Sequence, residues 1–151
     1  MSPARQALTA PDTDTSANAF RRERLIRFSD CDPAGIVFFP QYFIMFNGLV
    51  EDWVNEGLDV GYQKLVIDRR VGLPTVSLQA DFVAPSKMGD IVTLSLSVAR
   101  LGGSSLTLAL SCDGADGPRM KFRQVLMTTS LETHRAIEIP ADLREAIERF
   151  A

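Results

Sequence analysis

The sequence has few of the residues that build metal centres and disulfide frameworks. Its 151 residues include one histidine, His134, and two cysteines, Cys31 and Cys112, whose spacing forms no pairing pattern. This excludes a disulfide framework and a histidine–cysteine metal cluster of familiar spacing, and we expect neither a metal nor another cofactor. The 16 Lys and Arg nearly balance the 19 Asp and Glu, so the net charge of −3 indicates no general affinity for nucleic acid or anionic lipid.

Long hydrophobic runs are also missing. No stretch approaches the roughly 18 consecutive apolar residues that a membrane span needs, although 46% of the residues are hydrophobic. Residues 1–19 are small and mostly polar, so they indicate neither a signal peptide nor an anchor and predict a disordered lead-in. Residues 20–151 fit a single domain with a hydrophobic core. We expect a cytoplasmic protein without membrane or nucleic acid partners.

The most informative stretch is 28–57, FSDCDPAGIVFFPQYFIMFNGLVEDWVNEG, in which an acidic turn leads into an apolar segment. Asp30 and Asp32 lie in the turn, and the proline and glycine that follow direct the chain out of a strand. Pro40 suits the first position of a helix, where its missing N–H would have no partner in any case. Apolar residues then recur on nearly all sides, which predicts a buried helix over 40–56.

Alternation of apolar and polar residues predicts a set of antiparallel strands. The expected strands are 24–28, 75–84, 91–100, 104–112 and 120–131. A short helix at 62–68 and a charged C-terminal helix at 141–150 complete the expected elements. Each strand has one apolar and one more polar face, so the sheet is expected to pack one side on the central helix, in an α+β architecture.

The motif DCDPAGIVFFPQYF at 30–43 resembles the signature of the 4-hydroxybenzoyl-CoA thioesterase family, in the branch that carries an aspartate in this loop. The segments 71–92 and 134–142 are similar as well, so the resemblance covers about residues 22–145. It implies a hotdog fold, in which an antiparallel sheet of about five strands wraps around one long central helix. It also implies an acyl-CoA thioesterase, a hydrolase that assembles as a dimer or homotetramer with its active site between two subunits.

The residues of the acidic turn suit thioester hydrolysis. A thioester carbonyl needs an attacking oxygen and hydrogen-bond donors for its developing oxyanion. An aspartate is ionised at neutral pH and can attack directly or deprotonate a water, while a helix start offers free backbone N–H groups. By the resemblance, Asp32 matches the catalytic aspartate, and the backbone N–H of Phe39 matches the group that polarises the carbonyl. We interpret Asp30 as the residue that positions the turn.

Substrate recognition is expected to involve Asn47, Tyr62 and Arg135. In members of the family that select a para-hydroxylated ring, an acid stands at the place of Asn47 and a tryptophan at the place of Tyr62. Arg135 falls where the family has a basic residue, and a cation there can hold a phosphate of CoA. The other candidate cations are Arg100, Arg119, Lys121 and Arg123. These departures indicate an aromatic or medium-sized acyl group and leave its identity open.

One alternative of a different class shares these features: a non-hydrolytic acyl-CoA or acyl-carrier binding protein, or a hydratase-like hotdog protein. Hydratases of this fold use a catalytic histidine, and the predicted central helix contains none. A serine hydrolase is disfavoured because the sequence has no GxSxG motif. The residues leave open whether Asp32 forms a covalent anhydride or activates a water, and whether the assembly is a dimer or a tetramer.

Overall fold

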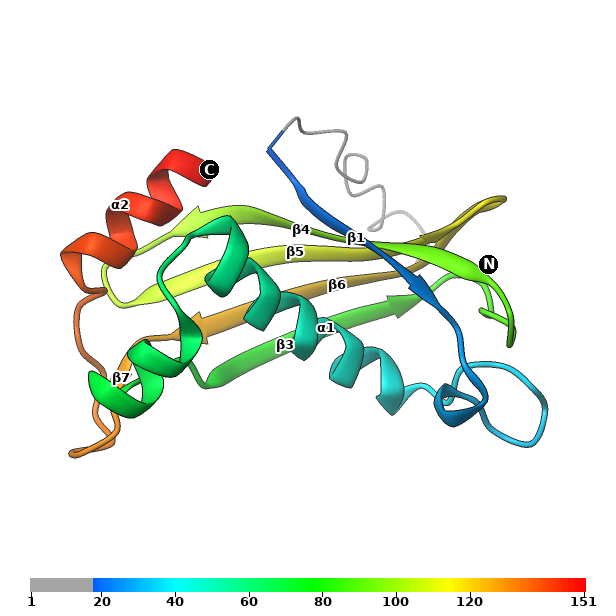
Figure 1. Cartoon of the computed structure of the whole chain (residues 1–151), viewed down its shortest axis with the longest axis horizontal. Helices are drawn as coiled ribbons and strands as arrows, with labels where there is room; N and C mark the ends of the chain where they lie inside the picture. The colour runs from blue at the N-terminus through cyan, green and yellow to red at the C-terminus, as the bar shows by residue number, and fades with distance from the viewer. Residues whose placement is uncertain (1–17) are drawn as a thin grey trace, which may run out of the picture.

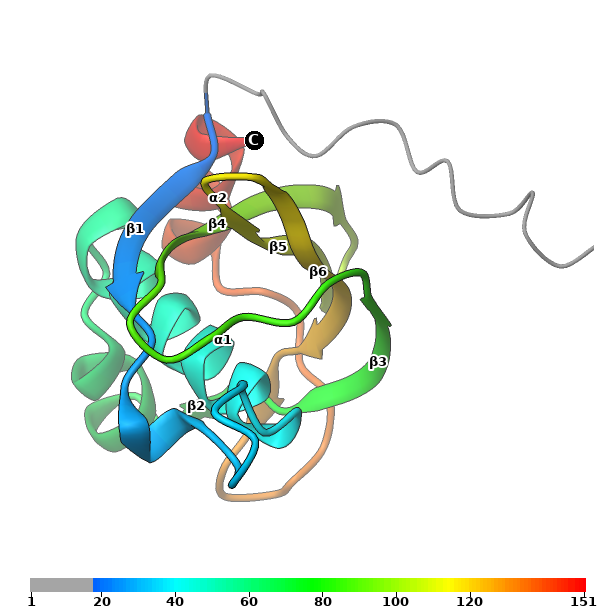
Figure 2. The ribbon, with the colours of Figure 1, turned by 90° about the vertical axis from the view of Figure 1, so that its right-hand side faces the viewer.

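The computed structural model describes residues 18–151, so residues 1–17 of the predicted lead-in lie outside the described part. Five strands form one antiparallel sheet in the order β1-β4-β5-β6-β3. Their bounds are Phe20–Leu25 (β1), Thr75–Phe82 (β3), Ile91–Leu101 (β4), Ser105–Gly114 (β5) and Gly117–Met127 (β6). Helix α1 (Pro40–Asp52) lies along the inner face of the sheet (Figure 1). The end-on view in Figure 2 shows the sheet curving around it, which confirms the predicted architecture.

The remaining elements are short, apart from the C-terminal helix. A two-stranded sheet pairs β2 with β7, and three helical turns connect the larger elements. Their bounds are Val71–Gly72 (β2), Thr129–Ser130 (β7), Phe28–Asp30 (η2), Trp53–Gly57 (η3), Lys64–Asp68 (η4) and Ala141–Phe150 (α2). The helix predicted over 141–150 is therefore confirmed. Within residues 18–151, no helix combines the length and the apolar character needed to cross a membrane.

The first strand lies earlier in the chain than predicted. The sequence indicated a strand over 24–28, whereas β1 begins at Phe20 and ends at Leu25. The pairing of β1 with β4 ends where Leu25 lies opposite Ile91, the first residue of β4. Beyond that point Ile26 bonds the turn before β4: its N–H donates to the Asp90 carbonyl and its carbonyl accepts the Gly89 N–H, both at 2.8 Å. The chain then turns into η2 and reaches the acidic turn.

The central helix is buried on one side only, which corrects the expectation of burial on all sides. Phe46 and Trp53 are each 1% exposed on the face toward the sheet. On the opposite face, Ile44 is 62% exposed and Asn47 and Glu51 are exposed as well. A single curved sheet covers only one face of a helix, so the apolar side chain of Ile44 stays exposed within one chain.

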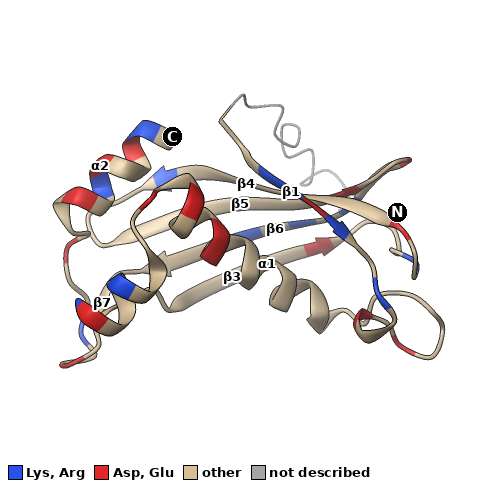
Figure 3. Ribbon diagram, in the orientation of Figure 1, with Lys and Arg blue, Asp and Glu red and all other residues tan. Residues whose placement is uncertain are grey.

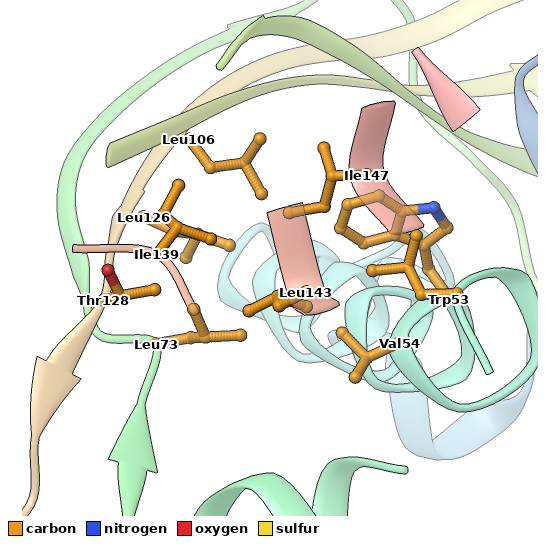
Figure 4. Close-up of a pocket in the computed structure, with 10 residues that line it drawn as sticks. Trp53, Val54, Leu73, Leu106, Leu126, Thr128, Ile139, Leu143 and Ile147 are labelled. Atoms are coloured by element: carbon orange, nitrogen blue, oxygen red, sulfur yellow. The ribbon is translucent and has the colours of Figure 1, made fainter. Parts of the chain in front are cut away.

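Helix α2 closes the end of the sheet opposite the acidic turn (Figure 1). Its Leu143 and Ile147 are each 1% exposed and meet Trp53 around an apolar cavity of about 10 Å³ (Figure 4). Arg69 fixes the start of α2 by donating two hydrogen bonds to the Asp142 carboxylate, at 2.7 and 2.8 Å. A cavity of this size holds about one water at most, so it is no site for an acyl group.

Candidate active site

Asp30 holds the acidic turn in place. The residue is 4% exposed, and its carboxylate accepts a hydrogen bond from the Arg24 guanidinium at 3.0 Å and another from the Arg27 N–H at 2.9 Å. Its backbone carbonyl accepts the N–H of Phe38 at 3.0 Å. Asp30 therefore ties the strand before the turn to the residues that precede α1, which agrees with its predicted positioning role.

Asp32 lies in the same turn with half of its carboxylate engaged. Oδ1 accepts the Ala34 N–H at 2.8 Å, and the Asp32 N–H donates to the carbonyl of Ile36 at 2.9 Å. Gly35, at a φ of +76°, permits this tight loop because it lacks a Cβ. The second oxygen, Oδ2, accepts no hydrogen bond from any of residues 18–151, and the side chain is partly exposed. One oxygen is thus oriented by the loop, and the other is accessible to a substrate or a water.

Cys31 lies between the two acids but is a poor nucleophile. Burial, together with the charges of Asp30 and Asp32, raises the pKa of its thiol above the ordinary value. The Sγ donates a hydrogen bond to the Arg27 carbonyl at 3.4 Å. Because the thiolate is the reactive form of cysteine, a raised pKa leaves the thiol protonated and unreactive at neutral pH.

The start of α1 leaves fewer free donors than the sequence indicated. Pro40 has no N–H, and the N–H groups of Gln41 and Tyr42 donate to the carbonyls of Phe38 and Phe39 at 2.8 and 3.2 Å. The N–H of Phe39 has no acceptor among residues 18–151. A tight turn that precedes the helix uses donors that would otherwise be free, so Phe39 alone remains available at this end of the described helix.

An aromatic wall runs from Phe39 to the edge of the sheet. The Phe39 ring, 56% exposed, meets Phe82 of β3 edge to face, with 6.0 Å between ring centroids. Phe82 in turn lies 6.1 Å from the ring of Tyr42, whose hydroxyl donates to Ser86 Oγ at 2.9 Å. The carbonyl of Ser86 accepts the N–H of Val37 at 2.9 Å. The loop that carries Asp32 and the wall beside Phe39 are therefore anchored by the same segment.

A groove of about 320 Å³ opens between α1 and the β3 edge of the sheet. Phe43 and Asn47 line it from the helix, and Leu78 and Phe122 line it from the strands. The ring of Phe122 lies 5.4 Å from that of Phe43. The volume is at the lower end of the range for ligand sites, and an apolar wall with a few polar groups is typical of them. Of the three predicted recognition residues, Asn47 lies in this groove.

Gln124 also lines the groove, and the sequence analysis missed it. It stands between Phe122 and Leu126 at an inward position of β6, where alternation calls for an apolar residue. Its Nε2 donates to Thr75 Oγ1 at 2.8 Å. The sequence signal that could have identified Gln124 is a polar residue at an inward position of an alternating strand.

The other two predicted recognition residues lie away from Asp32 within one chain. Tyr62 is half-buried, its N–H donates to Asn55 Oδ1 at 2.7 Å, and burial together with Glu51 raises the pKa of its phenol. Arg135 is exposed in the turn after β7. The connection 58–70 and the segment 131–139 lie at the left of Figure 1, whereas the acidic turn lies at the right. One chain therefore does not bring these residues together with Asp32.

One of the other candidate cations is occupied by structural contacts. The side chain of Arg119 is 9% exposed and donates to the carboxylates of Asp90 and Asp116 at 2.8 and 2.7 Å and to the Pro85 carbonyl at 2.9 Å. It is therefore no candidate for a CoA phosphate. Figure 3 shows the other positive residues spread over several elements of the described chain instead of gathered in one patch.

Comparisons with known proteins show which family the chain is similar to. A family model described as the thioesterase-like superfamily matches residues 26–147. The chain is 31% identical over 137 residues to the 4-hydroxybenzoyl-CoA thioesterase of Pseudomonas sp. (strain CBS-3), an alignment that covers 85% of this chain and 97% of that protein. It is 27% identical over 146 residues to a 1,4-dihydroxy-2-naphthoyl-CoA hydrolase of Prochlorococcus marinus, covering 90% of this chain and 89% of that protein.

The fold is similar as well. The solved structure of the Pseudomonas 4-hydroxybenzoyl CoA thioesterase superposes with a TM-score of 0.75 at 27% identity, over 86% of this chain and 99% of that one. Sequence and fold therefore agree over nearly the whole described chain. The protein belongs to the thioesterase-like superfamily and has the hotdog fold, as the acidic turn and the strand pattern predicted.

Proposed function

We propose that this thioesterase hydrolyses an acyl-CoA to the free acid and CoA, with Asp32 as nucleophile or general base and the Phe39 N–H as the donor to the thioester carbonyl. The observation that carries the proposal is a pair of unsatisfied groups at the two ends of one loop. Asp32 has a carboxylate oxygen without a partner, and Phe39 has an N–H without an acceptor, among residues 18–151. Asp30 holds the loop between them.

Two routes fit these groups. In the first, Asp32 attacks the carbonyl carbon, the bond to sulfur breaks, CoA leaves as a thiolate that takes up a proton, and water hydrolyses the resulting anhydride. In the second, Asp32 takes a proton from a water, which attacks the carbonyl carbon in its place, and the bond to sulfur then breaks as CoA leaves and takes up that proton. In both routes the carbonyl oxygen becomes negative, and the Phe39 N–H at the positive end of α1 stabilises that charge. A single donor of this kind is worth about 10²–10³ in rate.

The acyl group fits the groove between α1 and β3. Its walls are mainly apolar and aromatic, which suits the aromatic or medium-sized acyl group that the sequence indicates. The relatives act on 4-hydroxybenzoyl-CoA and 1,4-dihydroxy-2-naphthoyl-CoA, which are aromatic thioesters. Within the proposal, Asn47 contacts the acyl group, Tyr62 contributes to its binding, and Arg135 holds a phosphate of CoA.

The proposed site is completed by a second copy of the chain, in a dimer or a tetramer. The outer edge of β3 pairs with no other strand of the described chain, and its Val76, Leu78 and Phe82 are 51–53% exposed. Together with Ile44 on α1, they form an apolar surface of the kind that a subunit interface covers. A partner also offers a way to bring Tyr62 and Arg135 near the acidic turn of this chain.

The test is the release of free thiol from benzoyl-CoA, 3- and 4-hydroxybenzoyl-CoA, phenylacetyl-CoA and hexanoyl-CoA. We expect wild type to hydrolyse at least one of them and Asp32→Asn to lose about 10³ or more in kcat, because the amide neither attacks nor takes up a proton. Asp68→Asn, an exposed aspartate on η4, is the matched control and should keep wild-type rates. Binding of CoA esters without any release by wild type would show a binding protein instead. Full activity in Asp32→Asn would show that the site is elsewhere.

A further inference from the structure

The amide of Gln124 is the least satisfied polar group on the sheet side of the groove. The residue is 7% exposed, and its Nε2 donates to Thr75 Oγ1 at 2.8 Å. Its Oε1 is buried and accepts no hydrogen bond from any of residues 18–151. A buried acceptor without a donor is a rare and unfavourable feature of a folded protein, so it calls for a reason.

The surroundings of Gln124 are those of a ligand site and not of a polar network. Phe122, which precedes it on the inner face of β6, packs against Phe43 and Phe46 of α1 with 5.4 Å between centroids in both pairs. Asn47, on the opposite wall, is exposed, so water can satisfy its amide. Gln124 thus differs from Asn47 in needing a partner that enters the groove.

The groove lies within reach of the thioester position. Phe43 is one helical turn and Asn47 two turns beyond Phe39, so the groove lies about 6 to 12 Å along the helix axis from the Phe39 N–H. Helix side chains lean toward the N-terminus, which shortens this separation. An acyl group whose carbonyl meets the Phe39 N–H therefore extends along the groove toward the level of Asn47 and Gln124.

We propose that Gln124, oriented by Thr75, determines specificity for the acyl group by accepting a hydrogen bond from a hydroxyl at its distal end. This inference rests on the proposed function and extends it to a residue of the sheet. Thr75 uses one N–H of Nε2, and Oε1 is the amide atom that lacks any partner, so a hydroxyl that enters the groove can supply the missing donor. The last side-chain torsion of Gln is soft, so a small rotation that keeps the Nε2 bond to Thr75 turns Oε1 toward that donor.

The consequence is discrimination between acyl groups that differ by one hydroxyl. A site built to hydrogen-bond a hydroxyl rejects the analogue that lacks it much more strongly than an apolar pocket rejects a missing methylene. For one neutral acceptor in an open groove, we expect a preference in kcat/KM of about 10- to 10³-fold for one of the hydroxybenzoyl-CoA isomers over benzoyl-CoA.

The experiment compares kcat/KM for benzoyl-, 3-hydroxybenzoyl- and 4-hydroxybenzoyl-CoA in wild type and Gln124→Met. Methionine keeps the length of the side chain and removes the acceptor. We expect the variant to lose the preference for the hydroxylated ester while its kcat/KM for benzoyl-CoA stays within about 3-fold or rises. Gln79→Met, at an exposed position of β3, is the matched control and should keep the wild-type preference. Thr75→Val should weaken the preference, because it releases the amide, and its exposed edge position serves as the second test if Gln124→Met does not fold.

The outcomes separate this inference from the proposed function. The role of Gln124 would be refuted if Gln124→Met kept the wild-type ratio of kcat/KM between the hydroxylated ester and benzoyl-CoA. It would also be refuted if wild type hydrolysed all three esters at equal rates. Neither result would contradict the proposed hydrolysis. If wild type releases no thiol from any ester, calorimetry measures the dissociation constants of the three esters, and their ratios replace the ratios of kcat/KM. A preference for the hydroxylated ester that Gln124→Met abolishes would support the inference even then, and a preference that it leaves unchanged would refute it.

Discussion

Arg119 is predicted to stabilise both the fold and the acidic turn, and Arg119→Met tests this. The guanidinium is nearly buried and donates to Asp90, Asp116 and the Pro85 carbonyl. Asp116 is 80% exposed, so that pair contributes little. The bonds to Asp90 and to the Pro85 carbonyl are charge-assisted, and their loss should lower the free energy of unfolding by about 2–4 kcal/mol in total.

The same substitution should lower catalytic activity, because Arg119 acts through the segment 85–90. That segment contacts the acidic loop at two points, where the Ser86 carbonyl accepts the Val37 N–H at 2.9 Å and the Met88 N–H donates to the Gly35 carbonyl at 2.9 Å. Loosening the segment releases the loop that orients Asp32. We expect kcat in the folded Arg119→Met variant to fall about 10-fold or more, since small misplacements of reacting groups are costly.

The assay is urea unfolding followed by the fluorescence of Trp53, the single tryptophan, which is 1% exposed. Arg123→Met, on the outer face of the same strand, is the matched control and should change stability by less than about 0.5 kcal/mol. A double-mutant cycle with Asp90→Asn should give a coupling energy of about 1 kcal/mol or more between Arg119 and Asp90. A loss of stability equal to that of Arg123→Met would refute the reasoning.

The effect of Arg119→Met should also depend on pH. The hydrogen bond from Arg119 lowers the pKa of the Asp90 carboxyl below its usual value. A carboxyl whose folded-state pKa is lowered adds stability above its unfolded-state pKa of about 3.9, and this contribution is lost as pH falls through the folded value. The difference in unfolding free energy between wild type and Arg119→Met should therefore be constant near neutral pH and narrow below about pH 4. A difference that stays constant down to about pH 3 would contradict this linkage.

Two further predictions concern the acidic turn itself. Cys31→Ser should keep thioesterase activity within about 3-fold, because the raised pKa of the thiol leaves it unreactive, and thiol alkylation of wild type at neutral pH should be slow. A loss of about 100-fold would assign Cys31 a chemical role. Gly35→Ala should destabilise the protein by about 1 kcal/mol and lower kcat, because its φ of +76° is strained for a residue with a Cβ. Unfolding and rate measurements on one preparation check both effects. An unchanged kcat would show that the conformation at Gly35 does not affect the reactivity of Asp32.

The sequence by itself determined what local patterns encode. Alternation along residues 75–84 and 104–112 predicted strands, because each side of a sheet meets one environment, and β3 and β5 lie there within about two residues at each end. Pro40 marked the start of α1, because proline fits the first helical turn. The DCDPAG motif placed two acids in one turn and carried the family resemblance. These features depend on residues close together in the chain, so no knowledge of distant contacts was needed.

The tertiary structure decided which of these groups remain available. At the described start of α1, Phe39 alone keeps a free N–H, because the N–H groups of Gln41 and Tyr42 donate within the turn that precedes the helix. That Arg119 is structural depends on Asp90, which the turn before β4 brings to it. That Gln124 keeps a buried acceptor depends on Thr75, its hydrogen-bond partner on the neighbouring strand β3. Burial and hydrogen-bond satisfaction are set by residues far apart in the chain, and local periodicity carries no information about them.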